Sequence, residues 1–148
     1  MSIALVSAMR SKDPRKKVGA CIVDPNKRIA SVGYNGFPNG CSDDIFPWNR
    51  SDDKTDLNAK HPYVVHAELN AILNSKSSLK DSTLYVTLFP CNECAKAIIQ
   101  SGVKCVIYKE EPNDEKKMIA SKLMFDAAGI DYFKYDEVDT IKIKIKGE

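Results

Sequence analysis

Helical and β-rich runs alternate along the second half of the chain, and this alternation restricts the fold more than any other feature. The runs are a helix from Val65, a strand over 82–88, a helix over 91–101, a strand over 104–108, a helix over 116–128 and a strand over 131–135. Strands joined through a helix lie parallel in one sheet. The order therefore predicts an α/β fold with a mostly parallel second half and helices covering the sheet.

The first half of the chain contains a predicted hairpin over residues 18–34. Two β-rich runs there, GACIVD and IASVGY, are separated by the turn sequence PNKR. A long polar and aromatic segment, 35–62, follows the hairpin. A loop of that length inside a compact domain is usually functional or disordered. Its Phe37, Phe46 and Trp48 favour an ordered loop.

Length and charge bound the class of protein. The 148 residues are about one domain long, so we expect a single domain over 1–148. The 43% hydrophobic and 28% charged residues are ordinary for a globular protein. A net charge of +2 does not indicate a polyanionic partner, so nucleic acid is not expected and small substrates stay open.

No targeting or membrane segment is expected. The N-terminal MSIALVSAMRSK has too short an apolar run and no basic leader for a signal peptide, and no later run approaches membrane-spanning length. The five cysteines are odd in number and irregularly spaced, which argues against a disulfide framework. We therefore expect a soluble cytoplasmic protein with mostly reduced thiols and no membrane partner.

The C-terminal TIKIKIKGE alternates isoleucine and lysine with the period of a strand that has one wet face. Lysines in such a strand also discourage unwanted edge pairing. Two interpretations stay open. The isoleucine face meets another subunit, or the segment is an edge strand or a frayed terminus.

Two short motifs carry the chemistry. The stretch YVVHAELNAI contains His66 and Glu68, which taken alone fit a core histidine and an acidic residue near a helix N-terminus. The stretch TLFPCNECAKAI contains Cys91 and Cys94 directly after Pro90. At i and i+3 in a first helical turn these thiols lie on one side, and the helix dipole favours their thiolates. That pair fits either one bound cation or a thioredoxin-like redox pair.

The histidine favours the cation. Two thiolates and one imidazole are three of the four ligands of a tetrahedral zinc, which leaves one position for water, as in catalytic zinc sites. The other cysteines, Cys21, Cys41 and Cys105, occur singly and do not obviously complete a closed four-ligand site. A structural zinc that uses Cys41 or Cys105 is the alternative.

Glu68 constrains where the metal can lie. Residues two apart on a helix point about 200° away from each other. His66 and Glu68 can therefore face one metal only if it lies off the helix N-terminus. This predicts two helix starts facing each other across the metal, with Glu68 outside the coordination sphere.

The combined pattern, H-x-E followed by P-C-x-x-C, is the signature of zinc-dependent nucleobase deaminases. Hydrolytic deamination needs hydroxide at neutral pH, and zinc can lower the pKa of a bound water from 15.7 to about 7. A carboxylate such as Glu68 can take the water's proton, deliver it to the ring nitrogen and help to protonate the departing amine.

Longer blocks between Ser11 and Val103 resemble the deoxycytidylate (dCMP) deaminase family. They are SKDPRKKVGACIV, GYNGFPNGCSDD, PWNR, HAELNAI and LFPCNECAKAIIQSGV. The resemblance implies a three-layer α/β/α cytidine deaminase-like fold with a mixed five-stranded sheet. It implies conversion of dCMP and water to dUMP and ammonia, which supplies dUMP for thymidylate synthesis.

The family's zinc ligands match His66, Cys91 and Cys94, and its proton shuttle matches Glu68. Two departures stand out. The chain starts close to the SKDP block, so the family's first helix is expected to be shortened. A histidine and cysteine cluster for the second, structural zinc of some members is not evident, so we expect one zinc per subunit.

Nucleotide contacts are expected from two further groups. Asn35, on the loop after a strand, can hydrogen-bond the deoxyribose hydroxyl. Phosphate donors can come from Ser11, Lys12, Arg15, Lys16 and Lys17, although RKK is equally a solvated charge run.

The glycine-rich block is expected to contact nucleotide, over Gly33 to Asp44. Family members use this region for an allosteric site at which dCTP activates and dTTP inhibits, and hexamers are common among them. The residues concerned are Gly33, Tyr34, Gly36, Asn39, Gly40, Asp43 and Asp44. Turn formation alone explains the glycines equally well. Asp43 and Asp44 can hold Mg²⁺ on a triphosphate effector or cap a turn.

Other functions stay open beside this one. A nucleic-acid editor would show a wider basic track with stacking aromatics. Cytidine, guanine or pterin-precursor deamination shares the zinc site, and dCTP is a possible additional substrate. A noncatalytic zinc-stabilised nucleotide sensor would keep the ligands, but Glu68 argues against it.

Overall fold

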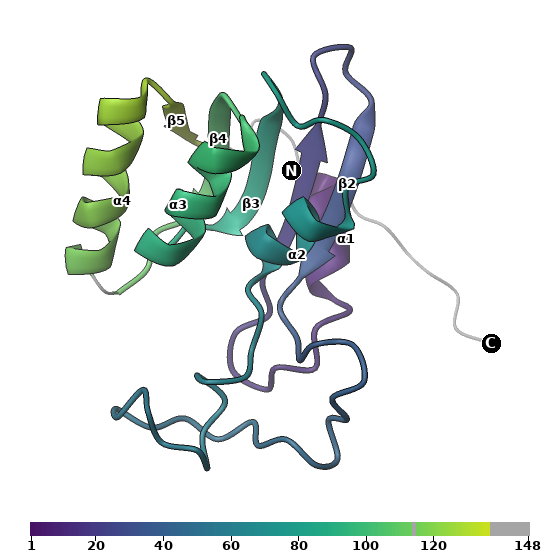
Figure 1. Ribbon diagram of the computed structural model, residues 1–148, viewed down its shortest axis with the longest axis vertical. Helices are drawn as coiled ribbons and strands as arrows, with labels where there is room; N and C mark the ends of the chain where they lie inside the picture. Colours follow the sequence, from purple (N-terminus) through teal and green to yellow (C-terminus); the bar gives the residue numbers. More distant parts are fainter. Residues whose placement is uncertain (114, 137–148) are drawn as a thin grey trace.

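The structure is a computed structural model that describes residues 1–113 and 115–136 (Figure 1). Its elements are α1 (Ser2–Ala8), β1 (Gly19–Val23), β2 (Ile29–Tyr34), α2 (Ala67–Asn74), β3 (Thr83–Leu88), α3 (Asn92–Ser101), β4 (Cys105–Glu110), α4 (Glu115–Ala128) and β5 (Asp131–Lys134). Among these helices none has the length and apolar character needed to cross a membrane. The isoleucine and lysine repeat near the C-terminus lies outside the described residues.

The strands form one mixed sheet in the order β2-β1-β3-β4-β5. β1 pairs antiparallel with β2 and with β3, whereas β3–β4 and β4–β5 are parallel. The predicted hairpin, the five-stranded mixed sheet and the parallel second half are therefore confirmed. A parallel pair needs a crossover, and α3 and α4 supply it.

Helices cover the sheet from two sides. Figure 1 shows α2, α3 and α4 on one face and α1 behind the other. Close contacts at two glycines agree with this arrangement, since Gly19 lies against α1 and Gly33 lies against α2. The predicted three-layer α/β/α architecture is confirmed.

The main core lies between the sheet and α2, α3 and α4. One face of the strands supplies the buried side chains Ala20, Ile22, Leu84, Val86, Val106 and Tyr108. Phe89, just after β3, packs edge-on against Tyr108 at a ring-centroid distance of 4.7 Å and against Phe125 of α4 at 6.1 Å. Because Phe89 immediately precedes the Pro-Cys sequence, this packing fixes the segment that leads into α3.

The long loop is packed around an aromatic cluster, as its composition predicts. Phe37 stacks on Trp48 with ring centroids 4.3 Å apart, and Phe46 meets Phe37 at 5.6 Å and Tyr63 at 5.1 Å. Offset and edge-to-face pairs of this kind each add stability beyond their buried area. The cluster joins the start of the loop to the residues just before α2.

Two helices begin slightly later than the sequence pattern predicts. α2 begins at Ala67 rather than near Val65, and α3 at Asn92 rather than at Cys91. His66 (φ −71°, ψ 156°) and Cys91 (φ −72°, ψ 168°) are instead extended N-cap residues. Hydrophobic periodicity cannot separate a cap from a first turn, because a cap side chain faces the same neighbours.

Gly33 tests how closely α2 must approach the sheet. A Cβ on Gly33 would lie 2.3 Å from Ala67 O and 2.4 Å from Ala71 N, so Gly33→Ala must push α2 outward. We expect a loss of about 1–3 kcal/mol in the free energy of unfolding, measured by urea titration. Gly36→Ala, whose Cβ would meet only a Tyr34 ring atom at 3.9 Å, is the matched control. Equal stability of the two variants would contradict the close approach.

Candidate metal centre

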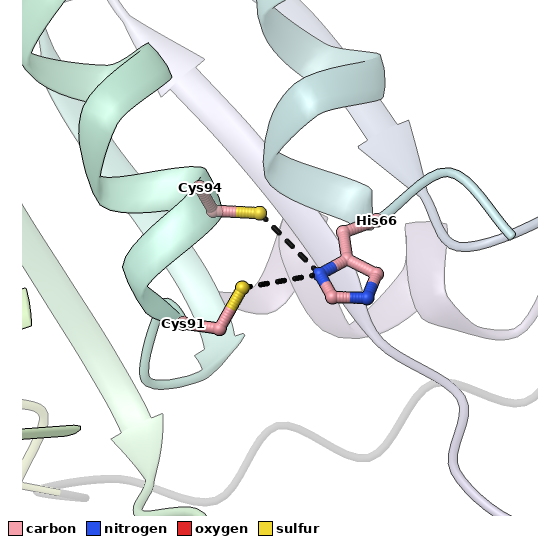
Figure 2. Close-up of side chains that lie close together, drawn as sticks. All are labelled: His66, Cys91 and Cys94. Carbon is pink, nitrogen blue, oxygen red and sulfur yellow. Dashed lines mark hydrogen bonds between the residues drawn. The ribbon is translucent and has the colours of Figure 1, made fainter. Parts of the chain in front are cut away.

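The N-termini of α2 and α3 meet, as predicted, and bring three ligand side chains together (Figure 2). His66 is the N-cap of α2, Cys91 is the N-cap of α3, and Cys94 is the third residue of α3. The cap carbonyls accept the first helical hydrogen bonds, from Asn70 N–H at 3.0 Å and from Ala95 N–H at 2.8 Å. The ligand side chains are therefore placed by the helix caps themselves.

Contacts on the neighbouring chain fix each cap. Val65, just before His66, exchanges two backbone hydrogen bonds with Gly36, of 2.9 and 3.1 Å. Pro90, just before Cys91, accepts a 2.9 Å hydrogen bond from the buried Ser121 hydroxyl of α4. Neither cap can move without breaking a hydrogen bond to another element.

The three side chains have the dimensions of a tetrahedral zinc site. His66 Nδ1 lies 3.5 Å from Cys91 Sγ and 3.4 Å from Cys94 Sγ, and all the ligand atoms lie within 4.8 Å of one another. Zinc–sulfur and zinc–nitrogen bonds of about 2.3 and 2.0–2.1 Å at tetrahedral angles separate sulfur and nitrogen by about 3.6 Å. Two thiolates and an imidazole are also zinc's preferred donors, so the residues fit the ion.

The two thiols differ in their readiness to ionise. Hydrogen bonding from Cys94, assisted by His66, lowers the pKa of Cys91 to about 3. The same hydrogen bond, together with burial and the nearby Glu68 charge, raises the pKa of Cys94. Cys91 is thus the thiolate of the pair, and a cation between the sulfurs favours the thiolate at both.

Glu68 lies in the first turn of α2, outside the ligand group but on the wall of the same pocket. Its side chain is buried, with 4% of the residue exposed. Burial raises the pKa of this carboxyl, whereas the nearby His66 acts in the opposite direction. A carboxyl with a raised pKa in a pocket can both accept and return a proton near neutral pH.

A pocket of about 250 Å³ leads from this centre to the loop ends. Its apolar wall includes Val18, Leu88 and Phe89. Polar groups face the pocket from several segments and include Asp13, Lys16, Asn35, Lys60, His61 and Glu68. An apolar cleft with a few convergent polar groups is typical of a small-molecule site.

Asn35 lines this pocket, and three hydrogen bonds fix its side chain. Its Oδ1 accepts a 2.8 Å hydrogen bond from Val18 N–H, and its Nδ2 donates to Lys16 O at 3.0 Å and to Asp13 Oδ2 at 3.3 Å. Both amide hydrogens are therefore used, and the second lone pair of Oδ1 is left for a ligand.

The five candidate phosphate donors of the basic block lie in different surroundings, and only Lys16 among them lines this pocket. Lys16 lines the pocket and pairs with Glu110. Ser11 is buried, and its hydroxyl accepts a 3.2 Å hydrogen bond from Asp13 N–H. Lys12 pairs with Asp43 at 2.7 Å. Arg15 and Lys17 are exposed and do not line this pocket.

The glycine-rich block also divides. Gly33 lies beneath α2, so packing requires it. Tyr34, Gly36 and Asn39 border a separate hollow beside α2. Gly40 adopts a positive φ of 86° with open space around it.

The two acidic residues of the block make local contacts. Asp43 binds Lys12 and accepts a hydrogen bond from Trp48 Nε1 at 3.2 Å, and the Lys12 hydrogen bond lowers the pKa of this carboxyl. Asp44 donates its N–H to the Ser42 hydroxyl at 3.2 Å.

Sequence reasoning missed two charged residues that face the pocket, Asp13 and Lys60. Asp13 is buried in the SKDP block, and Lys60 reaches it from the far end of the long loop. A lone acid and a lone lysine 47 positions apart carry no local pattern that would connect them. Only the path of the loop brings them together.

Comparisons with known proteins agree with this geometry. A family profile described as the cytidine and deoxycytidylate deaminase zinc-binding region matches residues 1–110. The chain is 53% identical to the deoxycytidylate deaminase of Pongo abelii and 51% identical to that of Homo sapiens. Each match spans 137 residues, 91% of this chain and 76% of the relative.

A solved structure gives the same result. The dCMP deaminase of the cyanophage S-TIM5, in complex with dCMP and dUMP, superposes with a TM-score of 0.71 at 30% identity. The match covers 90% of this chain and 92% of that one. The resemblance seen in the sequence blocks is therefore confirmed, and the chain is a deaminase that belongs to the cytidine and deoxycytidylate deaminase family.

Proposed function

We propose that the chain, acting as a single domain over 1–148, catalyses the hydrolytic deamination of dCMP to dUMP and ammonia. The observation that carries this proposal is the buried Glu68 carboxyl in the pocket that is also lined by His66 and Cys91, two members of the His66, Cys91 and Cys94 group. The relatives named deoxycytidylate deaminase and the cyanophage complex with dCMP and dUMP support the choice of substrate. The product dUMP would supply thymidylate synthesis in the cytoplasm.

One zinc ion per subunit would be held by His66 Nδ1 and the thiolates of Cys91 and Cys94. When bound there with a free fourth position, zinc lowers the pKa of water from 15.7 to about 7 and so supplies a nucleophile at neutral pH. The chain contributes the three ligands, a fixed geometry and an apolar wall that limits the access of bulk water.

Glu68 moves the protons. Its carboxylate accepts a proton from the attacking water as the new C–O bond forms at C4 of cytosine. The resulting carboxylic acid donates that proton to the ring nitrogen N3. It then carries a second proton from the added hydroxyl to the exocyclic amine, which leaves as ammonia when the C4–N bond breaks. Burial raises the pKa of Glu68, which makes its carboxylate a stronger base for the first transfer.

The rest of the pocket would orient the nucleotide. The free lone pair of Asn35 Oδ1 accepts a hydrogen bond from the deoxyribose hydroxyl. The apolar wall of Val18, Leu88 and Phe89 accommodates the base. Lys16, alone among the five basic-block candidates, lines the pocket and supplies a cation near its mouth.

We propose regulation at the hollow bordered by Tyr34, Gly36 and Asn39, with dCTP as activator and dTTP as inhibitor. This hollow also touches Asn70 and Asn74 of α2, the helix that begins at the ligand His66. A nucleotide bound there would act on the metal centre through α2. Mg²⁺ on the triphosphate would bind Asp43 or Asp44, and subunits would assemble into a hexamer.

Replacement of the proposed proton shuttle gives the first test. Glu68→Gln keeps the side-chain shape but replaces the ionisable carboxyl by an amide that cannot take up a proton, so we expect kcat for dCMP to fall roughly 10²- to 10⁴-fold. Ammonia release gives the rate, and elemental analysis gives the zinc content, which should not change. Glu93→Gln, an exposed acid in the first turn of α3, is the matched control and should keep full activity. Wild-type activity in Glu68→Gln would contradict the mechanism.

A substrate panel with zinc-loaded and zinc-stripped protein gives the second test. We expect ammonia release from dCMP, loss of this release after chelation and its return when zinc is restored. The reason is that the three side chains hold the zinc, which supplies the nucleophile. The panel also contains dCTP, CMP, deoxycytidine and single-stranded DNA. Release from a member other than dCMP alone would indicate a deaminase with a different substrate, and no release from any member would indicate a nucleotide sensor or a different base as substrate.

Titration with effectors tests the regulatory proposal. In the presence of Mg²⁺, dCTP should lower the dCMP concentration that gives half-maximal rate, and dTTP should raise it, because each would bias the position of α2. Rates and oligomer size are measured in the same samples. If neither nucleotide changes the saturation curve or the oligomer size, this protein lacks the regulation.

A further inference from the structure

A buried ion pair joins two loops inside the substrate pocket. Asp13 belongs to the segment between α1 and β1, and Lys60 lies near the end of the long loop, yet their side chains are 2% and 12% exposed. Both line the pocket together with Asn35 and Glu68. A buried ion pair has to overcome a large desolvation cost, so it is weak evidence for stability alone.

Asp13 is a hub for four donors. Its Oδ1 accepts backbone N–H groups from Arg15 at 2.9 Å and Lys16 at 3.2 Å. Its Oδ2 accepts the Asn35 amide at 3.3 Å and the Lys60 ammonium. Burial opposes ionisation, but the Lys60 and backbone hydrogen bonds keep the pKa of Asp13 below its usual range. The carboxylate is therefore a fixed anion with its acceptor sites filled.

Lys60 is held at both ends. Its backbone N–H donates to Asn49 O at 2.8 Å, and its carbonyl accepts N–H groups from Tyr63 and Val64 at 3.0 Å each. At the other end the ammonium is fixed to Asp13. An ammonium has three donor hydrogens, and among the described residues Asp13 is the acceptor found for Lys60. Lys60 thus presents unused donors on the pocket wall.

The other lysine of the pocket differs in its surroundings. Lys16 pairs with Glu110, and these side chains are 48% and 50% exposed. Water and salt screen such a pair, whereas a buried ammonium interacts more strongly with an incoming anion. Between the two pocket lysines, Lys60 is therefore the cation that water and salt screen less.

The position of Lys60 matches the shape of a nucleotide. Asn35 Nδ2 and the Lys60 ammonium both donate to the same oxygen, Asp13 Oδ2, so the Asn35 amide group, whose Oδ1 is left for a ligand, lies next to the ammonium. The sugar hydroxyl and the 5′-phosphate of a nucleotide are likewise close together, on neighbouring branches of one ring. A ligand whose hydroxyl meets Asn35 therefore directs its phosphate toward Lys60.

We propose that Lys60 binds the 5′-phosphate of the nucleotide, and that Asp13 is the positioning residue that sets Lys60 and Asn35 at a common spacing. This inference rests on the proposed function, since it names a subsite for the same nucleoside monophosphate. It explains why a buried ion pair lies in the pocket wall. Asp13 orients the cation, and the phosphate occupies the donors that Asp13 leaves free.

The first experiment compares ligands with and without phosphate. In Lys60→Met, kcat/KM for dCMP should fall roughly 10- to 150-fold, the range for loss of a hydrogen bond to a charged group, and the value for deoxycytidine should stay unchanged. Lys76→Met removes the same charge from an exposed site outside the pocket and is the control. Equal losses for both substrates, or an unchanged ratio, would overturn the proposal.

Binding of the products separates this inference from the proposed function. Calorimetry with dUMP and deoxyuridine needs no turnover, so it tests Lys60 even if the wild-type protein does not deaminate dCMP. Loss of dUMP affinity alone in Lys60→Met supports the phosphate subsite. Wild-type deamination of dCMP combined with unchanged dUMP affinity in Lys60→Met overturns the subsite and leaves the proposed function intact.

Asp13 needs its own variants, because Lys60→Met leaves a buried carboxylate unpaired. The double variant Asp13→Asn with Lys60→Met removes both charges and serves if the single variant does not fold. Asp13→Asn alone should weaken both dUMP and deoxyuridine, since it loosens Lys60 and Asn35 together. Zinc content and the bound fraction at saturation should not change. An Asp13→Asn protein that binds deoxyuridine as tightly as the wild type would overturn the positioning role.

Discussion

Two of the three candidate metal ligands, His66 and Cys91, are helix N-caps, and the third, Cys94, lies in the first turn of α3, so the arrangement depends on keeping the two helix N-termini together. His66 and Cys91 are 25 positions apart, and each is the last extended residue before a helix. A shift of either helix along its axis would separate the ligand atoms. Gly33 beneath α2, the Gly36–Val65 bridge and the Ser121 hydrogen bond to Pro90 all act against such a shift.

The same arrangement sets the electrostatics. Two helix N-termini point at one site, and each contributes a partial positive charge that favours thiolates. The hydrogen bond from Cys94, assisted by His66, acts in the same direction at Cys91 and lowers the pKa of this thiol. Glu68 has the opposite requirement, since burial holds its carboxyl toward the protonated form. The proposed function thus needs deprotonated thiols and a carboxyl that takes up a proton within one site, although all these residues belong to first turns or caps.

Local pattern explains what the sequence could predict. Strand and helix alternation led to the correct sheet, and the H-x-E and P-C-x-x-C spacings named the three side chains that the structure brings together, because each feature lies within one turn or one strand. The cap positions of His66 and Cys91 were missed by one or two residues, since periodicity does not distinguish a cap from a first turn. Gly33 had seemed a turn or ligand residue, but its requirement comes from α2, 34 positions away. Asp13 and Lys60 had no local signal at all.

The loops thus supply the charged pair at the other end of the pocket, which no helix or strand provides. The helices fix the end of the pocket beside the candidate metal centre, through His66, Glu68 and Cys91. The opposite end is built from segments without regular structure, and a fixed charge is hard to hold there, because loop side chains are usually solvated and mobile. In this pocket the Asp13 carboxylate is buried and is held in place by four hydrogen-bond donors. One carboxylate thereby connects the SKDP segment, the residue after β2 and the long loop through hydrogen bonds.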